Sequence, residues 1–475
     1  MRSEGVRARI NRRNFLHSTA ATGAGLAFSQ RSFGQGKCAK KPDGINVALI
    51  GAGFQGQALM NACLKIPGVR FKALCDIWAA WNRKRVSRML KAYRHEHNTY
   101  VDYREMLDKE KDLDAVIVAT PDFWHARQTV ACLEAGLHVY CETAMSNTIE
   151  GARKMVEVAR KTRKLLQIGR QRRSNPRYLY CYEQLLEGRK VLGRIGAVSA
   201  QWNRVAGGSL GWSQNASLDR ATLEQYGYES MEQFRNWRWH KGLGGGPVVD
   251  LGSHQIDVFN WFLGANPSAV MASGHTGLLD NKTHRWYDTV MAVYEYETAS
   301  GPVCAYYQIL SSNRNNGHFE RFMGDRGTLE VSEAGNRTMV FPELMTTENS
   351  LWTRCVKEGC LVGPEEMMKM IDKLTVEKIA RSFFVVETLP TPQFVSDLAK
   401  GPIWPANRRF LTLPVEMNKP HHQPHLENFF DAVRCRAQLN CPAEVGYETA
   451  VAVLKVNEAV EAAGKLSFKP SDFKI

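Results

Sequence analysis

Residues 45–64, INVALIGAGFQGQALMNACL, contain the pattern that decides the fold. The run 45–50 is apolar apart from Asn46, which is typical of a strand buried on both faces. A G-x-G-x-x-G turn follows at residues 51–56 and opens a segment of helical composition. The next apolar run ends at Asp76, 20 residues after Gly56. A strand, a glycine turn, a helix and an acidic residue at this distance predict a dinucleotide-binding unit.

Each part of this motif has a physical task. Glycines allow a tight turn and a close approach of the backbone to a pyrophosphate, which the helix N-terminus faces. The Asp76 carboxylate accepts hydrogen bonds from ribose hydroxyls, and it favours NAD over NADP because it repels an additional phosphate. Arg83 and Lys84 follow closely, so NADP stays open. The expected cofactor-binding residues of this unit are Gly51, Gly53, Phe54, Gln55, Gly56 and Asp76.

The pattern of apolar runs along the sequence changes near residue 169. Before it, apolar runs such as DAVIVAT (114–120) and HVYCE (138–142) alternate with helical segments, which predicts a doubly wound parallel sheet over residues 45–168. After it, longer strand-like runs bounded by Gly, Asn and Asp predict an α+β domain over 169–475. We expect this second, substrate-binding domain to have a large, mostly antiparallel open sheet and C-terminal helices. Residues 335–410 read as loops and short helices.

The first 36 residues differ in charge from the rest. They contain six arginines against one acid, whereas the whole chain has a formal net charge of +14. Arg12 and Arg13 precede an apolar, Ala/Gly-rich stretch, which predicts a twin-arginine signal peptide over 1–36 and a periplasmic or otherwise exported protein. A disordered basic tail is the alternative. The stretch is too short for stable membrane insertion, and no long basic run indicates a nucleic-acid partner.

Two further stretches carry a family resemblance. DAVIVATPDFWHARQTVACLEAGLHVYCETAMS (114–146) and GGGPVVDLGSHQIDVFNWFLG (244–264) resemble the glucose–fructose oxidoreductase and inositol dehydrogenase (Gfo/Idh/MocA) family. The resemblance covers about residues 45–330 and 420–470. It implies a Rossmann domain, an α/β domain whose open sheet forms a homo-oligomer interface, and hydride transfer between a nicotinamide and a sugar, cyclitol or related polyol. A tightly bound NAD, as in some members, fits export.

The resemblance also assigns site residues. Asp250 and His254 stand four apart, and with Asp257 they are expected on one helical face. His254 is the expected proton acceptor or substrate hydrogen-bonding group, and Asp250 orients the substrate or the imidazole. The cofactor side gains Thr120, Pro121, His125, Glu142 and Gln171, although a core role for His125 stays open. The cysteines show no C-x-x-C pair, and we expect no metal and no disulfide framework.

One position departs from the family pattern. The family's Glu-Lys-Pro is Glu142-Thr143-Ala144 here. Thr143 cannot replace lysine as an acid or base, because a hydroxyl only relays a hydrogen bond. Three interpretations follow: His254 alone drives proton transfer while Thr143 shapes the pocket, the protein is a redox-neutral NAD-dependent glycoside hydrolase or lyase that uses transient oxidation, or it binds sugar or nucleotide without catalysis.

Overall fold

The computed structural model describes residues 44–279, 284–334, 337–343, 349–363 and 410–475. The expected signal peptide, residues 1–36, lies outside the described residues. So does most of the stretch 335–410, of which two elements are described, the strand β13 (Met339–Pro342) and the helix α12 (Asn349–Lys357). All described residues belong to one compact unit.

The N-terminal part contains a parallel sheet of six described strands in the order β3-β2-β1-β4-β5-β6. Apolar, fully buried residues dominate its central strands, as expected for a sheet covered on both faces. The strand order reverses between β1 and β4, and the crevice at the carboxyl ends there is where such sheets bind ligands. The strands are β1 (Ile45–Ile50), β2 (Val69–Cys75), β3 (Asn98–Tyr100), β4 (Ala115–Val118), β5 (His138–Cys141) and β6 (Leu166–Ile168).

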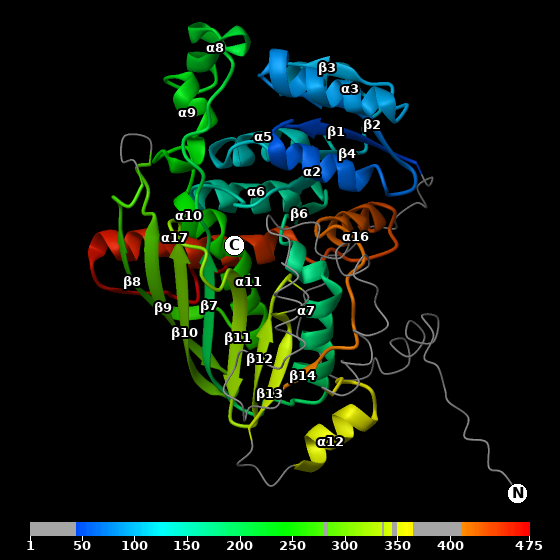
Figure 1. Ribbon diagram of the computed structural model, residues 1–475. Helices are drawn as coiled ribbons and strands as arrows, with labels where there is room; N and C mark the ends of the chain where they lie inside the picture. The colour runs from blue at the N-terminus through cyan, green and yellow to red at the C-terminus, as the bar shows by residue number, and fades with distance from the viewer. Residues whose placement is uncertain (1–43, 280–283, 335–336, 344–348, 364–409) are drawn as a thin grey trace, which may run out of the picture. The chain divides into compact units, whose positions relative to one another are not determined.

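Helices cover both faces of this sheet (Figure 1). Alternate residues of β1 divide between two cores: Leu49 packs on one side and Ile50 on the other. On the first side lie α2 (Phe54–Cys63), α3 (Lys84–Ala92) and α16 (Gln423–Val433). On the second lie α4 (Tyr103–Lys109), α5 (Asp122–Glu134) and α6 (Ile149–Thr162). The C-terminal helix α16 therefore completes the N-terminal domain.

A sheet of nine described strands follows, in the order β14-β13-β12-β11-β7-β10-β9-β8-β15. Its pairs are antiparallel except β7 with β10, so the predicted fold class, a Rossmann sheet plus a mostly antiparallel open sheet, is confirmed. Besides β13, the strands are β7 (Ile195–Asn203), β8 (Pro267–His275), β9 (Thr289–Thr298), β10 (Gly301–Leu310), β11 (His318–Gly324), β12 (Gly327–Val331), β14 (Leu411–Thr412) and β15 (Lys465–Ser467).

Helices α11 (Gly252–Leu263) and α17 (Ala443–Ala462) lie against this sheet, and α17 also contacts α6. Helix α10 (Gly246–Asp250) packs on α11 and α17. The sequence predicted one helix across residues 250–257, but the helix breaks at Leu251. Gly252 starts α11 directly on the ring of Tyr307, where a Cβ would lie 2.9 Å from a ring carbon. The remaining described helices are α7 (Pro176–Tyr180), α8 (Arg220–Gln225) and α9 (Met231–Arg235), with shorter turns at 171–174, 214–216 and 237–239 and wider ones at 79–83 and 181–188.

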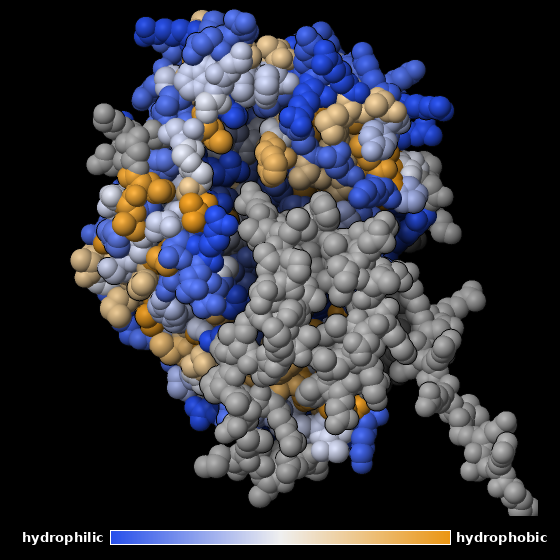
Figure 2. Space-filling model, viewed as in Figure 1, coloured by the Kyte–Doolittle hydropathy of each residue, from blue (hydrophilic) through white to orange (hydrophobic). Residues whose placement is uncertain are grey.

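The surface is mixed in character. Figure 2 shows hydrophilic residues over most of the upper part of the viewed face, where α3 and α8 lie, and separate hydrophobic patches below. Among the described helices, none combines the length and apolar character that a bilayer-spanning segment needs. Cys435 is disulfide-bonded, which the sequence did not predict because its cysteines show no paired spacing.

Candidate active site

The glycine turn between β1 and α2 has the geometry that a dinucleotide requires. Gly51 has φ +92°, and a Cβ there would lie 2.5 Å from the carbonyl oxygen of Ala119. A Cβ on Gly56 would lie 1.9 Å from the carbonyl oxygen of Gly51, so helix and strand pack too closely for a side chain. A Cβ on Gly53 would meet open space. The middle glycine therefore leaves room where a pyrophosphate approaches the backbone.

Asp76 lies beside this turn, directly after β2. Its carboxylate accepts hydrogen bonds from the backbone N–H groups of Ala52 and Trp78, both at 2.7 Å. Burial raises the pKa of Asp76, and these hydrogen bonds oppose the rise. The carboxylate is thus held at the edge of the cofactor turn, as the sequence predicts for a ribose-binding acid.

The first residues of α2 point in opposite directions. Phe54 is 91% exposed, whereas the Gln55 side chain turns toward the sheet. Gln55 Nε2 donates to Glu142 Oε1 at 2.9 Å and lies 2.9 Å from Nε2 of His422. Gln171 Nε2 also reaches Glu142 Oε1, at 3.2 Å. Two predicted cofactor residues, Gln55 and Gln171, therefore converge on the buried carboxylate of a third, Glu142, and His422 contacts Gln55 from the segment before α16.

Thr120, Pro121 and His125 lie at the carboxyl end of β4. The Thr120 hydroxyl donates to Gln128 at 2.6 Å. The His125 ring is buried, with its nitrogens 2.6 Å from the carbonyl oxygen of Ala144 and 2.7 Å from that of Thr120. Burial lowers the pKa of His125, but the Cys141 thiol and the two carbonyls raise it to about 9. The buried His125 ring therefore joins two loops, and each of its nitrogens already contacts a backbone carbonyl oxygen.

Thr143 lies at the junction of the two domains. Its Oγ1 is 3.1 Å from the Oγ of Ser253, at the start of α11. The buried guanidinium of Arg170 donates through Nη1 to both hydroxyls, at 2.7 Å to Ser253. A cation therefore stands beside the position where the family resemblance places a lysine.

His254 follows Ser253 and is only partly exposed. Its imidazole has no hydrogen-bond partner among the described residues and lies 6.0 Å from the ring of Trp202, centroid to centroid. Burial and the guanidinium groups of Arg170 and Arg172 hold the pKa of His254 well below its usual range. The imidazole is neutral at neutral pH, so it can accept a proton.

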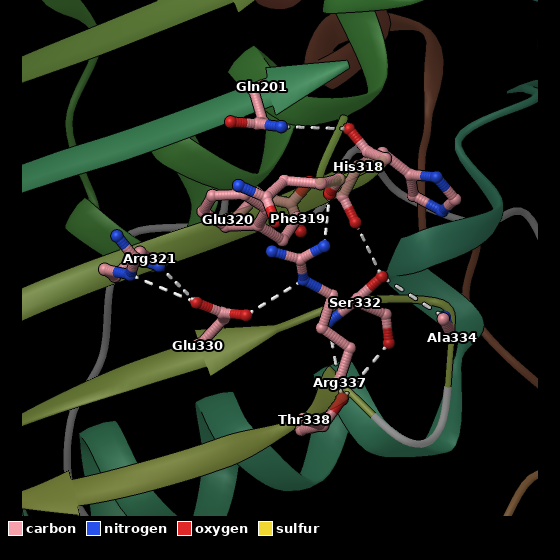
Figure 3. Close-up of polar contacts among 12 residues, drawn as sticks. Gln201, His318, Phe319, Glu320, Arg321, Glu330, Ser332, Ala334, Arg337 and Thr338 are labelled. Atoms are coloured by element: carbon pink, nitrogen blue, oxygen red, sulfur yellow. Dashed lines mark hydrogen bonds and ion pairs between the residues drawn. The ribbon is translucent and has the colours of Figure 1, made fainter. Parts of the chain in front are cut away.

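Ion pairs and a ring stack hold the side chains of the second domain near His254. Arg172 makes ion pairs with Glu320 and, at 3.2 Å, with Glu333, and the ring of His318 stacks on Trp202 at 4.7 Å. Figure 3 shows how the strand ends around His318 are held together. The Glu330 carboxylate accepts from Arg337 at 2.9 Å and from Arg321, and the Ser332 hydroxyl donates to the His318 carbonyl at 2.9 Å.

Asp250 lies at the end of α10, separated from α11 by the helix break. Its Oδ2 is 3.4 Å from Nε of Arg238, and no hydrogen bond among the described residues joins it to His254. It faces the buried Asp122, whose pKa is raised to about 7 by burial and by the Asp250 charge. Within the described residues, no group of three His, Cys, Asp or Glu side chains is arranged to hold a metal ion.

The comparison with known proteins agrees with this site geometry. Residues 45–170 match the model of an oxidoreductase family with an NAD-binding Rossmann fold, and residues 190–353 match the C-terminal alpha/beta domain of the same family. The chain belongs to the Gfo/Idh/MocA family. The expected cofactor, NAD, is confirmed by this match, and the glycine turn and Asp76 fit it.

Solved structures of similar fold include two sugar oxidoreductases. A levoglucosan dehydrogenase in complex with NADH aligns with a TM-score of 0.61 and 18% identity, over 90% of this chain and 99% of that one. An aldose-aldose oxidoreductase from Caulobacter crescentus, complexed with glycerol, aligns with a TM-score of 0.62 and 17% identity, over 90% of this chain and all of that one. At this identity the likeness shows that the Gfo/Idh/MocA fold extends over both domains.

Curated relatives match a shorter part of the chain. An alpha-N-acetylgalactosaminidase from Shewanella oneidensis and a glycosyl hydrolase family 109 protein from Shewanella baltica are each 30% identical over 175 residues. The match covers 33% of this chain and 38% of each relative's length. The chain therefore has curated relatives named as glycoside hydrolases and structural neighbours named as a sugar dehydrogenase and an aldose oxidoreductase.

The structure thus gathers five of the predicted residues at the junction of the two domains. Gln55, Glu142, Gln171, Thr143 and His254 approach it, whereas the His125 ring is enclosed and Asp250 is turned to Arg238. Sequence reasoning missed Arg170, Ser253, Trp202 and His422. A signal existed for Arg170 alone, since it follows the end of β6, where open parallel sheets place functional groups.

Proposed function

We propose that this protein transfers hydride between NAD and a hydroxyl-bearing carbon of a sugar, cyclitol or related polyol. The observation that carries the proposal is the neutral, unpartnered imidazole of His254, which lies at the junction with the NAD-binding domain. Thr143 and Glu142 lie on the Rossmann side of that junction, and Ser253 on the other.

The chain's own residues then divide the work. Gly51, Gly53 and Gly56 shape the turn that holds the cofactor pyrophosphate, and Asp76 faces its ribose. His254 accepts the proton of the substrate hydroxyl as the carbon is oxidised, and NAD supplies the hydride acceptor. Trp202 provides an aromatic wall beside the imidazole.

Co-purification and turnover test this proposal. Mass spectrometry of the denatured protein shows whether NAD is bound, and incubation with free sugars, cyclitols and polyols shows whether NADH accumulates. His254→Asn should lower kcat by a factor of about 100 or more and leave NAD binding intact, because the amide cannot accept the proton. Full turnover by His254→Asn would reject its role.

A second candidate function is redox-neutral glycoside cleavage through transient oxidation. The alpha-N-acetylgalactosaminidase relative and the threonine at position 143 favour it. Release of an aglycone from a glycoside panel without NADH accumulation would support this candidate, whereas NADH accumulation supports the dehydrogenase. Protein that neither binds NAD nor turns over either panel would support a non-catalytic sugar-binding role.

We also propose export and tight retention of NAD. Arg12-Arg13 ahead of the apolar stretch support a twin-arginine signal, and the disulfide at Cys435 is of a kind that persists in oxidising compartments. An exported enzyme cannot draw on a cytoplasmic NAD pool, so the nucleotide must travel with the folded protein. Arg12→Lys with Arg13→Lys should retain the protein in the cytoplasmic fraction; unchanged export would refute the assignment.

A further inference from the structure

Arg170 is a buried cation without a carboxylate partner. Its side chain is 1% exposed, and no ion pair to it is found in the described part of the chain. Nη1 donates to the hydroxyls of Thr143 and Ser253, while Nε and Nη2 have no hydrogen-bond partner among the described residues. The carboxylates of Asp257 and Glu142 act on the Arg170 charge through space, without an ion pair. A buried charge with no directly paired carboxylate is costly, so its retention calls for an explanation.

The contacts of Arg170 set the direction of the hydroxyl hydrogen bonds. A guanidinium only donates, so both oxygens act as acceptors toward it. The Ser253 O–H can then donate to the Asp250 carbonyl oxygen, which lies 3.4 Å away. The two hydroxyl oxygens lie 3.1 Å apart, and with Ser253 as the donor, to Asp250 or to the Thr143 oxygen, the Thr143 O–H can point to a further oxygen. Thr143 is only partly buried and stands beside the residue pair Ser253-His254.

The charge of Arg170 also acts at this hydroxyl. A cation against the oxygen of a donor makes that donor stronger, and a preorganised donor stabilises negative charge that develops on a reacting oxygen. A lysine ammonium would combine the charge and the donor in one group. Here the charge comes from the end of β6 and the donor from the end of β5.

We propose that Arg170 is a positioning residue that turns the Thr143 hydroxyl into the donor stabilising the substrate alkoxide. As the substrate H–C–O–H group becomes a carbonyl, the hydroxyl proton passes to His254, and bound NAD would accept the hydride from the carbon. The Thr143 hydroxyl meanwhile donates to the substrate oxygen and keeps its own proton. The inference rests on the proposed function and replaces the interpretation in which Thr143 only shapes the pocket.

Binding of a substrate carboxylate explains the buried charge of Arg170 less well than polarisation of the Thr143 hydroxyl does. Its Nε and Nη2 are enclosed by protein atoms, so a substrate carboxylate has no path to them. The nearby Arg172 is already paired with Glu320 and Glu333. The arrangement around Thr143 therefore supplies a polarised hydroxyl and no free anion site.

A double-mutant cycle tests the inference. Arg170→Met and Thr143→Val should each lower kcat by about 100-fold or more, with small changes in KM and NAD affinity, because one alkoxide-stabilising donor is lost. The double variant should be no slower than the slower single, since both act through one hydroxyl. Thr143→Ser should keep most of the activity. Arg220→Met, an exposed arginine on α8, is the matched control and should match wild type.

The pKa of His254, measured from its imidazole NMR signals, is a second readout that is independent of turnover. Loss of the Arg170 charge should raise this pKa. The same change should move the acidic limb of kcat/KM to higher pH. The other titratable groups that act on His254 are Arg172, Glu333 and His422, and they stay in place in every variant. Should Arg170→Met fail to fold, Arg170→Lys with Thr143→Val completes the cycle.

The outcomes separate the two claims. Wild-type protein that binds NAD but oxidises nothing in the panel refutes the proposed activity, and the inference with it. If wild-type protein is active and the kcat losses of the two single variants multiply in the double variant, the proposed role of Arg170 is refuted. The proposed activity then stands. A His254 pKa that does not move in Arg170→Met overturns the electrostatic argument in either case.

Discussion

Arg173 Nε lies 2.8 Å from Oδ2 of Asp257, and this ion pair joins the end of the Rossmann sheet to helix α11. The carboxylate is fully buried, and its other oxygen accepts from the Thr449 hydroxyl at 2.9 Å. Arg173 is mostly buried and packs over the ring of Trp261. Asp257 thus links the Rossmann sheet to α11 and α17 through Arg173 and Thr449.

Removing one partner of this pair should destabilise the protein. Asp257→Ala should lower the free energy of unfolding by about 3 kcal/mol, because it leaves the Arg173 charge buried and unpaired. Asp257→Leu combined with Arg173→Met should recover part of this loss. Urea unfolding measures both. Equal stability of Asp257→Ala and wild type would contradict the link.

Gly53 offers a test of the cofactor turn that leaves the fold intact. A Cβ there meets nothing in the protein, so Gly53→Ala should unfold at the wild-type temperature. NAD affinity should fall about tenfold or more, because the methyl group occupies the space of the pyrophosphate. Titration calorimetry of protein freed of nucleotide measures the affinity. Gly207→Ala, at an exposed glycine with equally open surroundings, is the control and should bind NAD normally.

His425 makes stability depend on pH. The buried ring accepts from the Ser174 hydroxyl at Nδ1, at 2.7 Å, and donates from Nε2 to the Ile168 carbonyl at 2.9 Å. Burial lowers the pKa of His425 to about 4, whereas an unfolded histidine titrates near 6.5. The unfolded state therefore binds more protons between these values, and stability falls as the pH falls through this window.

The pH dependence gives a measurable difference. His425→Gln keeps one acceptor and one donor but does not titrate. Between pH 7 and pH 4.5 it should lose about 2–3 kcal/mol less of its free energy of unfolding than wild type. Parallel pH dependences for the two proteins would show that His425 does not carry the effect.

We propose that the open face of the nine-stranded sheet forms the homo-oligomer interface that the family resemblance implies. Met271 on β8 and Met291 on β9 are 50% and 45% exposed. Cys304 on β10 is exposed as well. Met271→Lys with Met291→Lys should reduce the oligomer mass measured by light scattering, because two charges enter an apolar contact. A monomeric wild type would refute the proposal. Leu278→Lys, at an exposed residue outside the strands, is the control.

The local features of the site followed from the sequence more closely than its long-range contacts. The glycine turn and Asp76 lie where their spacing predicts, because strand, turn and helix are contiguous in the chain. The helix with Asp250 and His254 was predicted as one piece, but the approach of Gly252 to Tyr307 coincides with a break. That contact joins residues 55 positions apart, and no local pattern encodes it.

The sequence by itself determined the two sheets, the NAD-binding turn and the family, since hydrophobic period and glycine spacing are local properties of the chain. Only the tertiary structure decided which polar groups meet. It enclosed His125 between two carbonyls, paired Asp257 with Arg173, and set the buried Arg170 against Thr143. These contacts depend on how β5, β6 and α11 converge. A threonine that looked like the loss of a lysine is therefore a hydroxyl held by a cation from the neighbouring strand.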